Sequence, residues 1–370
     1  MKFTCNREDL ANAVSTVQRA ISNNPTVQIL NGILIETNTE GIKLTGYDLQ
    51  TGIEAFVTAE IDEKGSVVVL SKFFGELVRK LPEEIVEITV DDRYSVRVIC
   101  GNSNIKISGL DPEPFPKVPV IENQSNKLVL PQKSLKDMIN HTNFAVSKDA
   151  ARRVLTGSHL VSEGNILSVV SIDGFRMAIN KLDVGEDFPA IDYIVPGKTL
   201  NEIAKILSDD ENADMVIYTS DQHLLFDIGD VRIISRLIEG TFINTDTIIS
   251  KNPSTVLTCD CKQLLSAADR ASLIIMNSEK SQVAVQLHSK DNYNINISVA
   301  TESGTMDEPV EAEIEGEMFD VDFNVKYLID ALKNITDEKI RVELNGNQGP
   351  CIIRPVEGDS YTYLLLPVRR

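Results

Sequence analysis

Large aromatic residues and histidines are scarce in this chain. Its 370 residues include no tryptophan, 5% aromatic residues in all and four histidines. Val, Ile and Leu must therefore build most of the core. No apolar run approaches the roughly 18 residues that a membrane helix needs, and the N-terminal MKFTCNREDL lacks the apolar core of a signal peptide. We therefore expect no membrane partner and no secretory leader.

Cysteines are few, and their spacing excludes a disulfide framework. The chain has five, an odd number, which favours a reducing cytoplasm. Cys259-Asp260-Cys261 offers two metal ligands, but no second cysteine pair completes the four that structural zinc needs. Alternation of buried and exposed positions along a strand explains this tripeptide better. We expect no metal and no cofactor.

The motifs of common enzymes are also missing. Pro196-Gly197-Lys198-Thr199 resembles the end of a phosphate-binding loop, but Asp192 stands where that loop needs its first glycine. Neither G-x-S-x-G nor H-E-x-x-H occurs, and the acids form no pair distinct from a solvated surface. The sequence predicts a protein without catalysis of its own. An enzyme with a β-rich fold is the first alternative, and it would need a catalytic cluster confined to one domain.

Positive charge is in deficit. The chain has 36 Lys and Arg against 55 Asp and Glu, a formal net charge of −19. This balance argues against tight nucleic-acid binding, because phosphate neutralisation depends on Lys and Arg. It is compatible with weak binding of nucleic acid by a local basic surface.

What the sequence does contain is one helical stretch written three times, in residues 72–81, 198–207 and 326–335, at intervals of 126 and 128 residues. In each copy a Lys, an acid and a base share one helical face, and three apolar residues share the opposite face. The charged positions are Lys72, Glu76 and Arg79; Lys198, Glu202 and Lys205; and Lys326, Asp330 and Lys333. Three such matches at near-equal spacing predict a threefold internal repeat.

The stretches around these helices predict short strands, so that the order β-α-β-β-β occurs twice in each third of the chain. Residues 109–127 hold four prolines and residues 238–254 are irregular, so both are predicted to be linkers. We predict an α+β protein of three repeated domains, residues 1–120, 127–245 and 253–370. A turn position repeats as well, at Asp48, Asp173 and Glu302.

A threefold repeat with similar helices can build one common surface. If the domains join edge to edge, the helices form an inner wall and the sheets an outer wall. Closure into a ring then pairs every exposed sheet edge and removes the risk of aggregation that open edges carry.

The whole chain resembles a known family, the bacterial DNA polymerase III β subunits, or β sliding clamps. The resemblance rests on the three repeats at this length and on the motifs in residues 171–178 (SIDGFRMA), 323–327 (FNVKY) and 363–370 (YLLLPVRR). It implies the DNA-clamp fold, with helices lining a ring and sheets outside. The ring would be a homodimer around double-stranded DNA in the bacterial cytoplasm, associated with the nucleoid.

The same resemblance implies a set of partners. The ring would tether the catalytic subunit of the replicative DNA polymerase for processive synthesis and would be assembled by a clamp loader. Other polymerases and repair proteins would bind through short peptides rich in Gln, Leu and Phe. A non-enzymatic scaffold that never meets DNA is the second alternative, and charge reversal on the inner helices distinguishes it.

Basic residues on and near the helices are the candidates for facing DNA: Arg19, Lys72, Arg79, Lys80, Lys136, Lys148, Arg152, Arg153, Lys198, Lys205, Lys262, Arg270, Lys326 and Lys333. For each of them a solvated surface charge is the alternative. We expect the acid in each helical copy to pair with the bases of its own helix and so to soften the grip on phosphates.

The resemblance also implies a cleft for partner peptides between the second and third domains. Its residues would be Leu155, Ile172, Gly174, Phe175, Arg176, Met177, Ile243, Thr247, Ile248, Asn324, Tyr327, Gln348, Pro350, Leu364, Leu365, Leu366, Pro367, Val368 and Arg369. Phe175, Ile243 and Thr247 depart from the residues usual in the family. A strand alternates its faces, so some side chains of residues 364–366 must point into the core instead.

The resemblance finally implies a head-to-tail dimer interface. The first domain would contribute Ile105 and Ile107, and the third domain of the other copy would contribute Ile275 and Met276.

Overall fold

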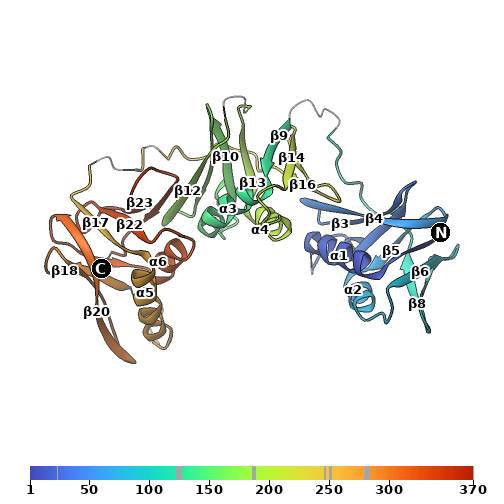
Figure 1. The fold of residues 1–370 in the computed structure, drawn as a ribbon, viewed down its shortest axis with the longest axis horizontal. Coiled ribbons are helices and arrows are strands. Elements are labelled where there is room, and N and C mark those ends of the chain that lie inside the picture. The colour runs from blue at the N-terminus through green and yellow to red at the C-terminus, as the bar shows by residue number, and fades with distance from the viewer. Residues whose placement is uncertain are drawn as a thin grey trace. The chain divides into compact units, whose positions relative to one another are not determined.

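The computed structural model describes residues 1–22, 24–121, 127–185, 189–245, 247–249, 252–278 and 284–369. The chain forms two compact units. Unit 1 contains Met1–Lys133 and Glu202–Leu237, and unit 2 contains Ser134–Asn201 and Ile238–Arg370. Each unit has one large sheet together with helices (Figure 1). Each therefore holds one terminal third of the chain and half of the central third.

The structure contains the β-α-β-β-β order six times, as the sequence predicts. The first third contains β1 (Lys2–Asn6), α1 (Arg7–Val17), β2 (Gly32–Thr37), β3 (Gly41–Tyr47), β4 (Thr51–Glu63), β5 (Ser66–Leu70), α2 (Ser71–Arg79), β6 (Ile85–Val90), β7 (Ser95–Cys100) and β8 (Ser103–Leu110). The central third contains β9 (Lys127–Pro131), α3 (Gln132–Thr142), β10 (Gly157–Glu163), β11 (Ile166–Ile172), β12 (Arg176–Asp183), β13 (Asp192–Pro196), α4 (Gly197–Ile206), β14 (Asp214–Thr219), β15 (His223–Asp227) and β16 (Val231–Arg236). The last third contains β17 (Thr255–Asp260), α5 (Cys261–Met276), β18 (Val285–Ser289), β19 (Asn294–Thr301), β20 (Gly304–Gly316), β21 (Asp320–Phe323), α6 (Val325–Leu332), β22 (Lys339–Leu344), β23 (Cys351–Pro355) and β24 (Tyr361–Leu365).

The sheet of unit 1 is built on the eight strands of the first third. They follow one another in the order β1-β6-β7-β8-β5-β2-β3-β4, and β1 also pairs with β4, so the strands close on themselves. The N-terminal half of β4 pairs antiparallel with β16, where Ile53 lies opposite Ile233. We call this pairing the first joint. Through it the sheet continues into β15, β14 and β9.

The sheet of unit 2 has the corresponding connection. β12 pairs antiparallel with β24, and Ala178 lies opposite Tyr363. We call this pairing the second joint. On one side of it lie β11, β10 and β13, and on the other lie the strands of the last third, from β23 through to β21. The same two strands of the repeat therefore form both joints.

The helices bury the apolar stripe that their repeat predicts. Phe74 of α2, Leu200 of α4 and Leu328 of α6 occupy equivalent positions and are all fully buried. The start of α1 is capped by Asn6, whose side chain accepts hydrogen bonds from the backbone N–H groups of Glu8 and Asp9. This cap satisfies two amides that a helix start leaves unpaired.

Two local predictions are wrong. Cys261 does not continue strand β17 but begins α5, because the side chain of Asp260 accepts a hydrogen bond from the N–H of Gln263 and caps the helix. The repeated turn position in the last third is Thr301, not Glu302. The Thr301 hydroxyl accepts from the N–H of Ser303, as the carboxylate of Asp173 accepts from the N–H of Phe175.

All five cysteines, which are Cys5, Cys100, Cys259, Cys261 and Cys351, are buried free thiols. None of the helices in the described part of the chain combines the length and apolar character that a bilayer crossing requires. Among the same described residues, no group of three or more His, Cys, Asp and Glu is placed to hold a metal ion.

Candidate functional site

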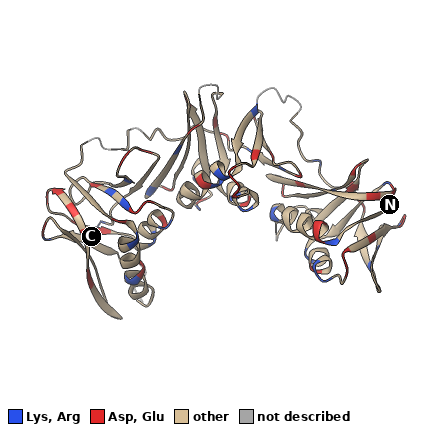
Figure 2. Cartoon of the chain, in the orientation of Figure 1, with Lys and Arg blue, Asp and Glu red and all other residues tan. Residues whose placement is uncertain are grey.

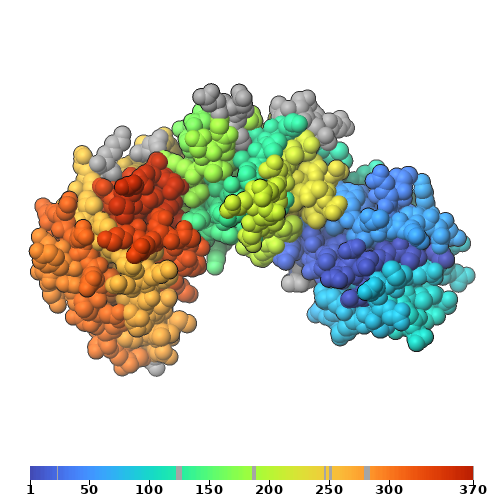
Figure 3. Space-filling model, viewed as in Figure 1, coloured from blue at the N-terminus to red at the C-terminus, as the bar shows by residue number. Residues whose placement is uncertain are grey.

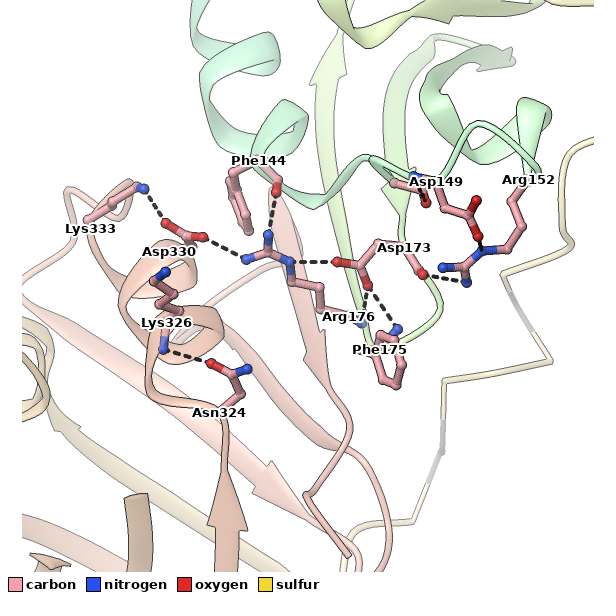
Figure 4. A network of polar contacts seen from close by, with 11 residues as sticks. Phe144, Asp149, Arg152, Asp173, Phe175, Arg176, Asn324, Lys326, Asp330 and Lys333 are labelled. Carbon is pink, nitrogen blue, oxygen red and sulfur yellow. Dashed lines mark hydrogen bonds and ion pairs between the residues drawn. The ribbon is translucent and has the colours of Figure 1, made fainter. Parts of the chain in front are cut away.

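The guanidinium of Arg176 is the centre of a polar network at the second joint (Figure 4). It donates to the Asp173 carboxylate at 3.0 Å, to the Asp330 carboxylate at 2.7 Å and to the carbonyl of Phe144 at 2.7 Å. The same group lies 5.4 Å from the ring centroid of Phe144 and 4.3 Å from that of Tyr327. The Arg176 side chain is only 9% exposed. It thus connects β12 with α6 and with the segment after α3.

The Asp330 carboxylate is shared between this network and the charged stripe of α6. Its second oxygen accepts from Lys333, one turn further along the helix. Burial acts to raise the pKa of Asp330, but the hydrogen bonds from Arg176 and Lys333 outweigh it and hold the pKa below its usual value. The predicted pairing of this acid with its own helix is therefore present, and it is joined by a second partner 154 residues away.

A tight turn precedes β12 and fixes the direction of Arg176. The Asp173 carboxylate accepts from the N–H groups of Phe175 and Arg176 at 2.8 and 3.0 Å. Between them Gly174 has φ of +94°, and a Cβ there would lie 2.6 Å from Nη1 of Arg152. That guanidinium donates to the carbonyl of Asp173 at 2.8 Å. The positive φ favours glycine at position 174, and a side chain there would displace the guanidinium of Arg152. The structure places Arg152 beside the candidate peptide residues rather than on a helix.

Four of the predicted peptide-binding residues share one apolar cluster. These are Leu155, Ile172, Met177 and Leu364, and the cluster also contains Val170, Ile179 and Ile352, which sequence reasoning missed. The period of two along a strand could have found Val170 and Ile179, because they lie two positions from the candidates Ile172 and Met177. Ile352 lies on β23, which pairs with the strand of the candidate Leu364. Leu365 points the other way, into the main core of unit 2.

An exposed apolar edge lies beside this cluster. Phe175 is 55% exposed, and its ring stacks on that of Tyr327, with centroids 6.5 Å apart. The carbonyl of Phe175 accepts from the N–H of Leu366, and the carbonyl of Asp322 accepts from the N–H of Val368. These bonds hold the C-terminal segment at the surface, where it is visible in red in Figure 3. Leu366 and Val368 are each 40% exposed.

The linker packs on the cluster through residues that neighbour the predicted cleft residues. Phe242 and Ile249 pack against the apolar cluster, whereas Ile243 and Ile248 are exposed. Phe242 also stacks on His159, with ring centroids 4.8 Å apart. The exposed Thr247 donates its hydroxyl to the carbonyl of Asn244. Phe242 and Ile249 therefore anchor the linker on the cluster, and the predicted Ile243, Thr247 and Ile248 remain exposed candidates for contact with a peptide.

The remaining candidates lie at the edge of this region or serve the fold. Asn324 caps α6 by accepting from the N–H of Lys326 at 3.0 Å. Gln348 and Arg369 are exposed, and Pro350 and Pro367 are half-buried.

The candidates for facing DNA are mostly exposed, and Lys and Arg are visible on the helices of both units in Figure 2. The exposed residues are Lys72, Arg79, Lys80, Lys148, Arg152, Arg153, Lys198, Lys205, Lys262, Arg270, Lys326 and Lys333, while Arg19 and Lys136 are half-buried. Arg270 is paired with Glu308. A basic side chain must be exposed to contact a phosphate, and most of the candidates are exposed.

Arg19 has a specific partner at the first joint. Its guanidinium lies 3.3 Å from the carboxylate of Glu202, which also pairs with Lys205 at 2.7 Å. Burial acts to raise the pKa of Glu202, but the hydrogen bonds from Lys205 and Arg19 outweigh it and lower the pKa. The third acid of the repeat, Glu76, is exposed and forms no ion pair with any other residue that the structure describes.

The expected interface residues lie in the first and last thirds of the chain, on β8 and at the end of α5. Ile105 is half-buried and Ile107 is buried on β8, whereas Met276 is 75% exposed at the end of α5, next to the half-buried Ile275. Along Ser103–Ser108, β8 pairs with β7 alone, since its pairing with β5 involves only Gly109 and Leu110.

Protein-family models of the three domains of the DNA polymerase III beta subunit match three consecutive parts of this chain. The N-terminal domain model matches residues 1–119, the central domain model 129–244 and the C-terminal domain model 246–369. The beta sliding clamps of Staphylococcus aureus and Halalkalibacterium halodurans are 34% and 35% identical to it, over 100% of this chain and 99% and 100% of theirs.

Solved structures agree. The crystal structure of the DNA polymerase sliding clamp from Bacillus subtilis has a TM-score of 0.95 and 34% identity, covering 100% of this chain and 99% of its own. A putative DNA polymerase III beta subunit from Eubacterium rectale has a TM-score of 0.95 and 31% identity, with both chains covered fully. The chain therefore has the three-domain clamp fold and belongs to the DNA polymerase III beta subunit family, the beta sliding clamps.

Proposed function

We propose that two copies of this chain close head to tail into a ring that encircles duplex DNA and tethers a DNA polymerase to it. The proteins of this family are non-catalytic processivity factors, so the ring acts by holding its partners on DNA. The observation that carries the proposal is the pair of joints inside the chain. Both use the same two strands of the repeat. The two remaining strands of this kind, β20 and β8, each keep a segment whose second edge has no partner strand among the described residues, and a second copy of the chain can pair it.

The register of that third joint follows from the repeat. The turn residues Asp48, Asp173 and Thr301 align Ile53, Ala178 and Met306, five positions later on β4, β12 and β20. Their opposite residues at the two internal joints are Ile233 and Tyr363. The equivalent position on β8 is Ile105. Two copies should therefore pair Met306 with Ile105 of the partner subunit, and Ile107 then lies opposite Gly304.

This pairing agrees with the dimer interface that the family resemblance implies. It brings the half-buried Ile105 into an apolar contact and places β8 against β20, the last strand of the half-unit that contains α5. Ile275 and Met276, at the end of α5, are then the natural apolar neighbours on the helix side. The backbone supports it as well, since β20 along Gly304–Glu308 is paired on one side by β19 and its pairing with β17 begins only at Ala312.

Loose attachment to DNA suits the charges of the helices. Lys72 and Lys326 are exposed at equivalent positions, but acids beside the bases of the stripe, such as Glu202 and Asp330, hold part of the positive charge in ion pairs. Each neutralised phosphate contributes to affinity and to its salt dependence, so a partly neutralised surface binds weakly. A topological link can then supply retention while the ring slides.

The surface around the second joint is the proposed docking site for partner peptides. Phe175, Leu366 and Val368 are exposed apolar side chains beside the cluster that contains Leu155 and Met177. Burying one Leu or Phe contributes about 1.5–3 kcal/mol. Two such anchors, less the cost of ordering a peptide, suit a micromolar complex of about −8 kcal/mol. The polymerase catalytic subunit, the clamp loader and repair proteins can then exchange on one ring.

The test combines solution mass with topology. Sedimentation should give twice the mass of the chain, and protein loaded on closed circular DNA should stay bound until the DNA is linearised. A monomer at micromolar concentration, or equal retention on circular and linear DNA, contradicts the ring.

A charge-reversal series tests which face meets DNA. Changing Lys72, Lys198 and Lys326 together to Glu should abolish loading or shorten retention on circular DNA, with unchanged solution mass and thermal midpoint. Exposed substitutions of this kind usually alter stability by less than about 0.5 kcal/mol. The matched control is Lys64, Lys117 and Lys339 to Glu, three exposed lysines outside the helices with the same change in net charge. Equal loss of retention in both variants contradicts a specific role for the helices.

A further inference from the structure

The helix side of each joint contains the same three positions of the repeat. The first position follows the start of α1, α3 or α5 by the same number of residues and is occupied by Arg19, Phe144 and Leu273. The second position directly follows the first lysine of the repeated stretch and is occupied by Phe73, Thr199 and Tyr327. The third is the acid of that stretch, which is Glu76, Glu202 or Asp330. Each joint combines the first position of one third with the second and third positions of the next third.

At the two internal joints, the first and third positions are paired or bridged, and at the second joint the second position joins them. At the first joint Arg19 pairs directly with Glu202 at 3.3 Å. At the second joint Phe144 and Tyr327 lie against the same guanidinium, that of Arg176, which also pairs with Asp330. An arginine thus binds the acid of the following third in both cases.

The remaining set, Leu273, Phe73 and Glu76, has no such contacts with the residues that the structure describes. Leu273 is 61% exposed and Phe73 is 54% exposed, although both are large apolar side chains on helices. Glu76 has no ionic partner among the described residues. The position equivalent to Arg176 is Gly304, so no arginine side chain is available there to bridge the set.

We propose that Leu273 packs directly on Phe73 of the partner subunit, and that Glu76 of the partner subunit lies at the rim of this contact. The inference rests on the proposed ring and assigns its helix-side contact to residues outside the predicted interface set. Gly304 leaves the space that Arg176 fills at the second joint, so the two apolar side chains meet without a bridging charge. α5 also runs to Met276 as a continuous helix, which presents a second exposed apolar residue at this end.

The first test is a double-mutant cycle on the dimer dissociation constant, measured by sedimentation of the full chain. Phe73→Ala and Leu273→Ala should each weaken one joint roughly tenfold. Because the ring has two such joints, each substitution should raise the dimer dissociation constant roughly hundredfold. If the two side chains touch, the double variant weakens the dimer less than the product of the single effects. Val129→Ala, at a position that is 51% exposed on β9, is the control and should leave the dissociation constant unchanged.

The second test uses charge and does not depend on lost volume. Leu273→Arg recreates the chemistry of Arg19 opposite Glu202, so it should weaken the dimer far less than Leu273→Glu. Adding Glu76→Lys to Leu273→Glu should restore most of the lost affinity. Equal effects of Arg and Glu at position 273, with no rescue, overturn the contact.

The two proposals fail in different ways. A monomeric wild-type protein removes the ring itself. A stable wild-type dimer whose dissociation constant is unchanged by Phe73→Ala and Leu273→Ala leaves the ring intact and overturns only this contact.

Discussion

At the first joint, Arg19 and Glu202 meet at 3.3 Å with their side chains 33% and 18% exposed. At the second joint, Arg176 is 9% exposed and binds two carboxylates and a carbonyl at once. The backbone pairing is the same at both, yet one joint is closed by a solvated ion pair and the other by a buried network. The repeat therefore fixes where domains meet, and individual side chains decide how firmly they are held and what else can bind there.

Replacing the two arginines should give the largest contrast. Arg176→Ala leaves Asp173 and Asp330 partly buried without their common partner, and breaking a buried pair in this way costs about 3–5 kcal/mol. Arg19→Ala should cost less than about 1 kcal/mol, because the pair is solvated and Lys205 still binds Glu202. The check is denaturant unfolding, with hydrogen exchange in β12 and β24 compared with β4 and β16. Equal losses would contradict the difference between the joints.

The C-terminal segment should separate the joints by partner binding. The second joint has Phe175 and Tyr327 where the first has Gln50 and Thr199, so only the second offers stacked aromatic rings. Deleting residues 366–370 removes Leu366 and Val368 and should weaken a Gln/Leu/Phe-type peptide roughly hundredfold, the equivalent of two lost apolar anchors less ordering costs. Fluorescence titration measures this.

Phe175→Ala is the milder variant for the same peptide, with an expected loss of roughly tenfold. Solution mass should remain that of the dimer in both proteins, because neither change touches β8 or β20. Unchanged peptide affinity after the deletion would place the docking site elsewhere.

The smallest effect is expected from mild acid. Both Glu202 and Asp330 have a folded-state pKa below the usual value, so their contribution to stability is complete above the unfolded-state pKa values of 4.5 and 3.8. It is lost as the pH falls through the folded-state values. Stability should therefore be flat in this respect from pH 7 to about 5 and decline below about 4. Asp330→Asn should reduce that decline more than Glu202→Gln, as measured by denaturant midpoints across pH 3–7.

The sequence predicted regular features well because they depend on local spacing. The buried Phe74, Leu200 and Leu328 follow from a helical period, and the Asn6 cap follows from the preference of Asn for helix starts. Both are decided within about one helical turn of chain. The six repetitions of β-α-β-β-β follow from the same kind of pattern.

What the sequence could not predict lies across the joints. The sequence predicts Arg176 as one residue of the peptide cleft, but its partners Asp330 and Phe144 come from other elements, and no local pattern links them. In the linker, Phe242 and Ile249 pack inward, and the predicted cleft residues Ile243 and Ile248 are exposed. No local pattern could assign these sides, because a segment without regular structure has no period that fixes its facing side. Burial in such places is decided by tertiary packing.

The buried thiols allow the opening of each unit to be followed separately by chemical labelling. Burial raises the pKa of Cys5, Cys259 and Cys351 to about 12 and that of Cys261 to about 11. A thiol reagent needs an exposed thiolate, so alkylation at neutral pH must wait until the surrounding structure opens. Cys5 and Cys100 report on unit 1, and the other three on unit 2. Peptide-resolved labelling rates of the unmodified protein would therefore show which half of the clamp opens first when it is loaded, strained or bound.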